Sequence, residues 1–173
     1  MTTPAEPRWL NDRERHAWLS FLATKELLED ALDRQLQRDA NLPHAYYQVL
    51  AMLSESPGRA LRMSQLAEIT NSSPSRISHA VARLEDAGWV ERRKTPTDKR
   101  GSVAALTDAG FAALAAAAPG HVGAVRHFLF DALTTEQVGQ LTAICAAALG
   151  RLDPDGAIRR SRFPQDHDGD PSR

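Results

Sequence analysis

Two short helical patterns joined by a polar break, and followed at once by two strand-like runs, occupy the middle of the chain. Apolar residues recur at helical spacing in "MSQLAEIT" and in residues 74–86, and "NSSPS" separates the two segments. The runs "GWVERRK" and "GSVAAL" then flank a turn rich in Lys and Arg, which predicts a β-hairpin. Two short helices and a hairpin in this order are the elements of a winged helix-turn-helix.

The ends of these helices are marked in the sequence. Ser64 is a candidate N-cap for the first helix and Ser73 for the second, where Pro74 suits the first helical position. Gly88 can adopt the left-handed conformation that ends many helices. We therefore expect the second helix to begin at Pro74 and to end before Gly88.

The second helix separates an apolar face from a polar face. At about 100° per residue, one side collects four apolar residues that we expect to be buried: Ile77, Ala80, Val81 and Leu84. The other side carries hydrogen-bonding groups: Ser75, Arg76, Ser78, His79 and Arg83. Such groups reach base edges and phosphates in a major groove. Arg76 is the foremost candidate for a guanine contact because it lies near the helix N-terminus, whereas Asp86 is placed outside the contact.

The alternative interpretation of this face is a solvated helix surface with ordinary polar residues. The hairpin weakens that alternative because its tip adds a second basic element. Its cations, Lys94, Lys99 and Arg100, are suited to lie along a phosphate backbone, and Arg100 can enter a minor groove. Asp98 is expected to pair with one of these cations and orient it, and Gly101 lets the strand leave the turn without a side-chain clash.

The charge of the chain is concentrated where these elements lie. The net charge of −1 argues at first against a nucleic-acid partner. Residues 59–104, however, carry nine basic and five acidic side chains, a net charge of +4, whereas residues 1–58 and 105–173 carry −3 and −2. The positive field therefore belongs to the middle of the chain.

Longer helices are expected on both sides of this segment. Residues 12–39 contain neither Gly nor Pro and repeat apolar residues at steps of three, four and seven, which predicts a helix of about 40 Å. That length exceeds the core of a small globule, so part of its apolar stripe should pack against a partner chain. Further helices are expected over residues 43–55, over 108–118 with Thr107 as cap and a break at Pro119-Gly120, and after Thr134. Residues 151–173 are expected to form a disordered tail.

The segment "LEDAGWVERRKTPTDKRGSVAALTDAG" resembles the MarR family of bacterial transcriptional regulators, whose wing carries a D-x-R-[GS] motif matched by Asp98, Arg100 and Gly101. "LPHAYYQVLAML", "MSQLAEIT", the second short helix, "LTDAG" and "LTTEQVGQL" follow in the family's order. The resemblance covers about residues 12–150. It implies a mainly α fold with a small β-hairpin wing, as a single domain over residues 1–150. Residues 42–107 would form the winged helix-turn-helix DNA-binding lobe, and residues 12–39 and 108–150 the interlocking dimerisation helices.

The resemblance also implies partners. A homodimer would read a pseudo-palindromic operator in double-stranded DNA with half-sites about 10 bp apart, and a small aromatic or anionic effector would release this repressor. The residues available to bind that effector are Trp18, Phe21, His44 and Tyr47, with Trp9 reaching over from the partner and His16, His44 or Lys25 anchoring an anion. Aromatic residues at helical spacing are also typical of core packing, which remains the alternative. Pro43 stands where the family often has Ser or Thr, which changes the cap of that helix.

No metal or cofactor is expected. His121 and His127 are six residues apart and do not share a helix face, and Cys145 is the only cysteine, so no internal disulfide can form. The apolar surroundings "LTAICAAALG" offer no cation that would stabilise a thiolate, which disfavours a redox role for Cys145.

Several function classes find little support in this sequence. No apolar run approaches the roughly 20 residues of a membrane span, so we expect a cytoplasmic protein without membrane contact. A phosphate-binding Gly-rich loop, a nucleophile motif and paired carboxylates are lacking, so we do not expect an enzyme. The remaining alternative is a winged-helix protein–protein interaction module without DNA binding, which would have no need of cations on its wing.

Overall fold

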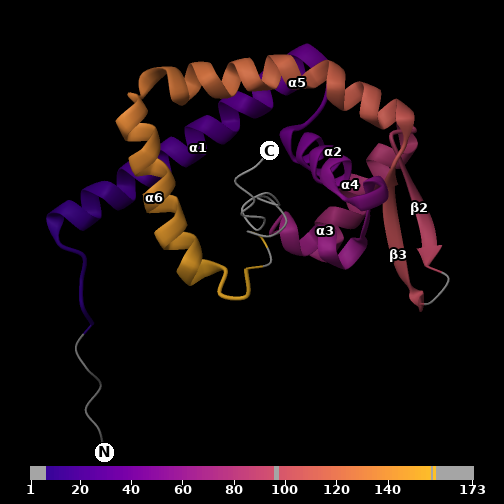
Figure 1. The fold of residues 1–173 in the computed structure, drawn as a ribbon, viewed down its shortest axis with the longest axis horizontal. Coiled ribbons are helices and arrows are strands. Elements are labelled where there is room, and N and C mark those ends of the chain that lie inside the picture. The colour runs from indigo at the N-terminus through magenta and orange to yellow at the C-terminus, as the bar shows by residue number, and fades with distance from the viewer. Residues whose placement is uncertain (1–6, 96–97, 157, 159–173) are drawn as a thin grey trace, which may run out of the picture.

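The computed structural model describes residues 7–95, 98–156 and 158, with the side chains of residues 95 and 98–101 left out. The long helix α1 (Asp12–Ala40) precedes a lobe made of α2 (His44–Glu55), η1 (Pro57–Arg59), β1 (Ala60–Arg62), α3 (Met63–Ile69), α4 (Pro74–Asp86), β2 (Val90–Thr95) and β3 (Asp98–Leu106). The chain then continues through α5 (Asp108–Phe128), η2 (Phe130–Ala132) and α6 (Thr135–Leu152). Figure 1 shows α5 running away from the lobe alongside α1, and α6 turning back from its far end.

The lobe shares its hydrophobic core with the long helices, because Leu36 of α1 and Leu114 of α5 belong to the same buried cluster. α2, α3, α4 and β3 contribute fully buried side chains to it: Val49, Leu50, Leu53, Leu66, Val81, Leu84 and Ala104. The four residues predicted to line the inner face of the second short helix, Ile77, Ala80, Val81 and Leu84, are all buried. The fold is therefore mainly helical with a small sheet, as the sequence predicts.

The sheet has three antiparallel strands in the order β1-β3-β2. The hairpin of β2 and β3 confirms the sequence prediction, with a register irregularity between Lys94 and Thr95. β1 was not predicted. Its three residues pair with Val103, Ala104 and Ala105 of β3, and a strand this short carries no alternation of its own to reveal it.

Side-chain caps fix most helix starts. Ser73 Oγ accepts from Arg76 N at 3.3 Å, and Thr107 Oγ1 accepts from Gly110 N at 3.0 Å, as expected. Gly88 has a φ of +73°, in the left-handed region predicted for it. The N-cap prediction for Ser64 was wrong, because α3 already begins at Met63. The helix after Pro43 has no cap from Pro43 itself; instead Asp33 Oδ1 of α1 accepts from His44 N at 2.8 Å.

The predicted break at Pro119-Gly120 was wrong. α5 continues through Pro119 as one helix to Phe128. A proline inside a helix removes one backbone hydrogen bond, but α5 packs along α1 there, and the missing side chain of Gly120 allows the close approach. A Cβ on Gly120 would lie 3.0 Å from Gln35 Nε2 of α1. Tertiary packing therefore stabilises a helix that the local sequence would interrupt.

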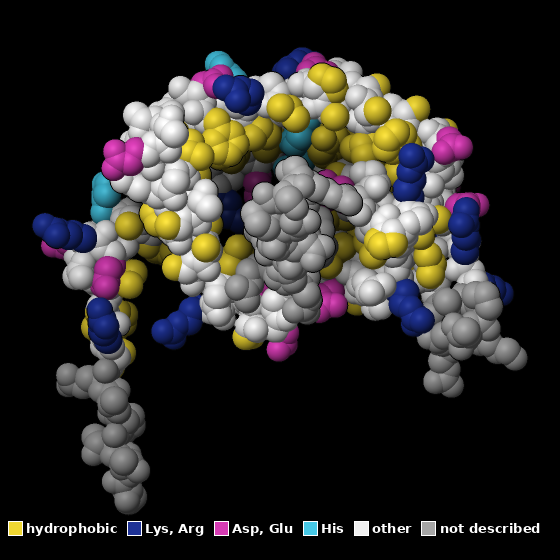
Figure 2. All heavy atoms as spheres, viewed as in Figure 1, with side chains coloured by type: hydrophobic (Ala, Val, Ile, Leu, Met, Phe, Trp, Pro, Cys, Tyr) yellow, Lys and Arg dark blue, Asp and Glu magenta, His cyan; other side chains and the backbone are white. Residues whose placement is uncertain are grey.

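The long helices leave much apolar surface exposed. α6 has no buried residue, and Leu19, Leu27, Val122 and Ile144 are all more than half exposed. Figure 2 shows hydrophobic side chains spread over α5 and α6 in this view.

The tail expected from residue 151 onward begins later than predicted. Arg151 and Leu152 still belong to α6, and Asp153 is buried. Arg159, Arg160 and Arg162 lie outside the described residues. No helix among those described is both long and apolar enough to span a membrane.

Candidate nucleic-acid interface

The polar side of α4 is open to solvent. All five side chains predicted to read DNA are exposed on it: Ser75, Arg76, Ser78, His79 and Arg83. The buried residues of the same helix, among them Val81 and Leu84, attach it to α2 and the sheet. The structure thus presents one face of a firmly anchored helix, with a hydrogen-bonding group at nearly every exposed position.

The cations of α4 and the wing differ in whether they form an ion pair with a carboxylate. Arg83 has a loose ion pair with Asp86, with 3.9 Å between Nη1 and Oδ2. Among the residues that the structure describes, no carboxylate pairs with Arg76 or Lys94, and both side chains are exposed. A guanidinium near the start of a helix, free of acidic neighbours, is suited to bidentate contact with a guanine or a phosphate.

The wing extends beside α4. Lys94 lies on β2 opposite Ser102 of β3, on the part of the hairpin that leads to the tip. The structure describes only the backbone of Asp98, Lys99, Arg100 and Gly101, so their predicted roles in the wing remain predictions. The described part of the wing nevertheless confirms that a strand carrying cations directly follows α4, the predicted reader helix.

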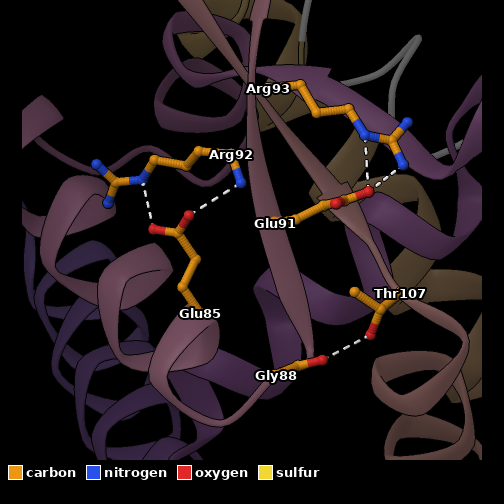
Figure 3. A network of polar contacts seen from close by, with 6 residues as sticks. All are labelled: Glu85, Gly88, Glu91, Arg92, Arg93 and Thr107. Carbon is orange, nitrogen blue, oxygen red and sulfur yellow. Dashed lines mark hydrogen bonds and ion pairs between the residues drawn. The ribbon is translucent and has the colours of Figure 1, made fainter.

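Arg92 was missed by the sequence analysis. It lies on β2 and reaches α4, where it contacts Glu85 and the backbone of Ser78 (Figure 3). Arg93, its neighbour, turns to Glu91 on its own strand. The sequence offered a signal only in the stretch of adjacent cations, which could not tell a cation paired within the protein from one available to a ligand.

A groove of about 510 Å³ separates α4 from the start of α2. Ser75, Arg76 and His79 line it from α4, and Tyr46 and Gln48 line it from α2. The two residues of α2 were not among the predicted DNA-binding residues. They add a phenol and an amide beside the reader face, both able to donate and accept hydrogen bonds.

The residues predicted to bind an effector fall into two separate places. Trp18 and Phe21 stack on α1 with ring centroids 6.2 Å apart, and they are 50% and 57% exposed. His44 lies instead beside Asp33, which is 15 residues after Trp18 on α1, or roughly 22 Å at the rise of a helix, and Tyr47 packs with His44's neighbour His121. Within one chain, therefore, the four residues do not line a common cavity.

His121 of α5 joins His44 and Tyr47. Its ring centroid lies 4.4 Å from that of Tyr47 and 5.4 Å from that of His44, and its Nδ1 is buried without a hydrogen-bond partner among the described residues. His127 packs against Phe128 instead. From the sequence, His121 is a candidate only for metal binding, and the described residues contain no group of three or more potential metal ligands.

Burial sets the protonation of this cluster. It lowers the pKa of His44, an effect that Asp33 and Glu29 oppose, and it lowers the pKa of His121, with the nearby His44 acting in the same direction. Burial also raises the pKa of Tyr47, and Glu55 adds to that rise. The cluster is therefore uncharged near neutral pH, where α2 meets α5.

Comparison with known proteins identifies relatives over most of the chain. The sequence model of the MarR family matches residues 40–101. The transcriptional repressor MprA of Escherichia coli strain K12 is 30% identical over 115 residues, which are 65% of this chain and 65% of the repressor, slightly less than two thirds of its length.

Two solved structures from Streptomyces coelicolor are similar over a larger part. The MarR family transcriptional regulator Sco3205, solved in complex with DNA, is 54% identical with a TM-score of 0.79, covering 84% of this chain and 92% of that chain. The regulator AbsC is 37% identical with a TM-score of 0.79, covering 86% of this chain and 99% of that chain.

Proposed function

This chain belongs to the MarR family of transcriptional regulators, and we propose that it is a homodimeric repressor that binds a pseudo-palindromic operator and is released by a small aromatic or anionic ligand. The observation that carries DNA binding is the exposed polar face of α4 beside the wing, with Arg76 and Lys94 unpaired within the described residues. The Sco3205 structure, 54% identical, contains DNA.

Dimerisation is supported by the long helices. α6 buries none of its residues within the chain, and α1 exposes Trp18, Phe21 and Leu27. Exposed apolar surface of this extent indicates an interface. In a two-fold symmetric dimer, two copies of α4 would enter successive major grooves about one turn of DNA apart.

The effector proposal is supported by the position of two residue pairs. His44 and Tyr47 contact His121 where the lobe meets α5. Trp18 and Phe21 lie on the exposed part of α1, from which a partner chain could bring them to the same junction. A ligand inserted at this junction would change the angle between the lobe and the long helices, and thereby the spacing of the two reader helices.

Binding of duplex DNA at increasing salt tests the function. We expect the logarithm of the affinity to fall linearly with the logarithm of the salt concentration, by about 0.9 per phosphate neutralised. Arg76→Ala should relax discrimination at one base position per half-site, by about 1–3 kcal/mol. Arg100→Ala should weaken binding to all sequences alike.

Arg126→Ala provides the control, since Arg126 pairs with Asp131 at the far end of α5. It should leave affinity and specificity unchanged. Equal losses on specific and random DNA for Arg76→Ala would contradict its assignment to a base. If the unaltered protein bound no duplex at any salt concentration, the alternative of a protein–protein interaction module would replace the proposal.

A further inference from the structure

Arg92 connects the wing to the reader helix through three polar contacts. Its Nη2 donates to the carbonyl oxygen of Ser78 at 2.6 Å, and its Nε lies 2.8 Å from Glu85 Oε2. The second carboxylate oxygen of Glu85 accepts from the backbone N of Arg92 at 2.9 Å. Figure 3 shows Glu85 and Arg92 facing each other across the space between α4 and β2. One strand residue thus holds the helix by both its side chain and its backbone.

The two contact points on α4 determine its orientation. Ser78 and Glu85 are seven residues apart, so they lie on the same side of the helix about two turns from each other. The buried face of α4, which includes Val81 and Leu84, packs the helix against the lobe. Apolar contact is non-directional, so packing alone fixes the rotation of the helix only loosely. Hydrogen bonds from a planar guanidinium are directional. Contacts at both points therefore restrict rotation of α4 about its own axis.

The same residue determines where the wing cations lie. Side chains alternate along a strand, so Arg92 and Lys94 project from one face of β2 and Glu91 and Arg93 from the other. Holding Arg92 against α4 therefore fixes the distance between Lys94 and the reader side chains. Arg93 forms its ion pair with Glu91 of the same strand, so this pair does not join β2 to another element.

Arg92 is also poorly suited to bind phosphate. Glu85 neutralises its charge, and both side chains are only 32% exposed. Arg76 and Lys94, by contrast, pair with no carboxylate in the described part of the chain. A cation already engaged by a carboxylate and a carbonyl would have to give up those partners to contact DNA.

We propose that Arg92 is a positioning residue for DNA recognition, which holds the wing and α4 at the spacing and rotation that two adjacent grooves require. The proposal rests on the DNA-binding function proposed above. α4 and the wing must enter neighbouring grooves together. If either could turn independently in the free protein, that freedom would be lost on binding, and this entropic cost would weaken the affinity for DNA.

Substitution by lysine separates the positive charge of an arginine from its planar hydrogen bonding. Arg92→Lys keeps the positive charge but cannot bind Glu85 and the Ser78 carbonyl with one planar group. We expect its affinity to fall about tenfold, the equivalent of about 1.4 kcal/mol, on the duplex that the unaltered protein selects from a pool of random sequences. Arg93→Lys, the neighbouring residue, is the matched control and should bind like the unaltered protein.

The salt dependence distinguishes positioning from phosphate contact. Arg92→Ala should weaken binding but keep the slope of log affinity against log salt, whereas Lys94→Ala should reduce that slope by about 0.9. Glu85→Gln should reproduce the loss seen in Arg92→Lys, and the double variant should lose no more than about twofold beyond either single one. Melting temperatures of all variants report whether the lobe stays folded, and Glu85→Gln, which preserves side-chain shape, keeps the test valid if an arginine variant unfolds.

Two results would overturn the proposal: full affinity in Arg92→Lys, or a slope reduced by about 0.9 in Arg92→Ala. Either would mean that the charge of Arg92, not its contacts with α4, serves DNA binding. Absence of DNA binding by the unaltered protein would instead refute the proposed function, so the two failures can be told apart.

Discussion

The lobe and the helices α1 and α6 differ in how far their apolar side chains are exposed to solvent. In the lobe, Leu50, Leu53, Leu66 and Leu84 are buried completely within one chain. In α1 and α6, by contrast, Leu27 and Ile144 are 68% and 66% exposed, although both belong to regular helices. The apolar residues of the lobe are thus covered within one chain, whereas α1 and α6 leave large apolar side chains exposed.

This difference predicts that mutations in the two regions affect two different properties, the stability of one chain and the association of chains. Mutations in the lobe core act on the stability of one chain, because close-packed interiors leave no room for altered volume. Mutations on the exposed faces of α1 and α6 should act on association instead, and their effect should depend on protein concentration.

The largest expected effect is on the lobe core. Leu50→Ala removes a fully buried side chain and should lower the free energy of unfolding by about 2–5 kcal/mol, measured by urea denaturation. Leu27→Ala removes the same atoms from an exposed site. At concentrations low enough to separate the chains it should change that free energy by no more than about 0.5 kcal/mol. Equal losses in the two variants would abolish the distinction between the regions.

The next effect is on association. Ile144→Asp places a charge in the middle of the exposed face of α6 and should convert a micromolar dimer into monomers in equilibrium sedimentation. Circular dichroism should retain the helical signal of the lobe. Thr142→Asp, on the opposite side of the same helix, is the control and should remain dimeric. A dimer that persists with aspartate at position 144 would assign the interface to another surface.

The smallest expected effect concerns the junction of the two regions. Burial depresses the pKa of His44 and His121, so the unfolded chain, where histidine titrates near 6.5, binds protons that the folded chain does not. Stability should therefore be complete above about pH 6.5 and decline as the pH falls below it through the depressed folded values. His121→Phe keeps a ring against Tyr47 without titrating, and should reduce the drop in melting temperature between about pH 7.5 and about pH 5.

His127→Phe is the control for this measurement, because His127 is exposed and packs against Phe128 rather than in the cluster. It should show the same drop as the unaltered protein. A melting temperature that falls equally in His121→Phe would mean that the acid sensitivity arises elsewhere.

Much of the lobe follows from local signals. Ser73 and Thr107 were predicted as caps and accept the expected backbone hydrogen bonds, because capping involves residues only three positions apart. The buried face of α4 was predicted because its periodicity is a property of one helix. The exposed reader residues followed from the same periodicity.

Contacts between distant residues were not predicted. β1 exists only because β3, about forty residues later in the chain, supplies its partners. Pro119 lies within a continuous helix because α1 packs beside it. His121 and His44 come from separate helices, and their proximity left no trace in the spacing of either.

Local sequence accounts for the order of the helices, the caps at Ser73 and Thr107, the polar side of α4 and the basic character of the wing, because each depends on neighbours within a few turns of chain. Tertiary packing, by contrast, brings Arg92 into contact with Glu85 and Ser78 and leaves Arg76 open to a ligand. Both are arginines with polar neighbours in sequence. What separates them is which other element lies within hydrogen-bonding reach, and that depends on the packing of helix against strand.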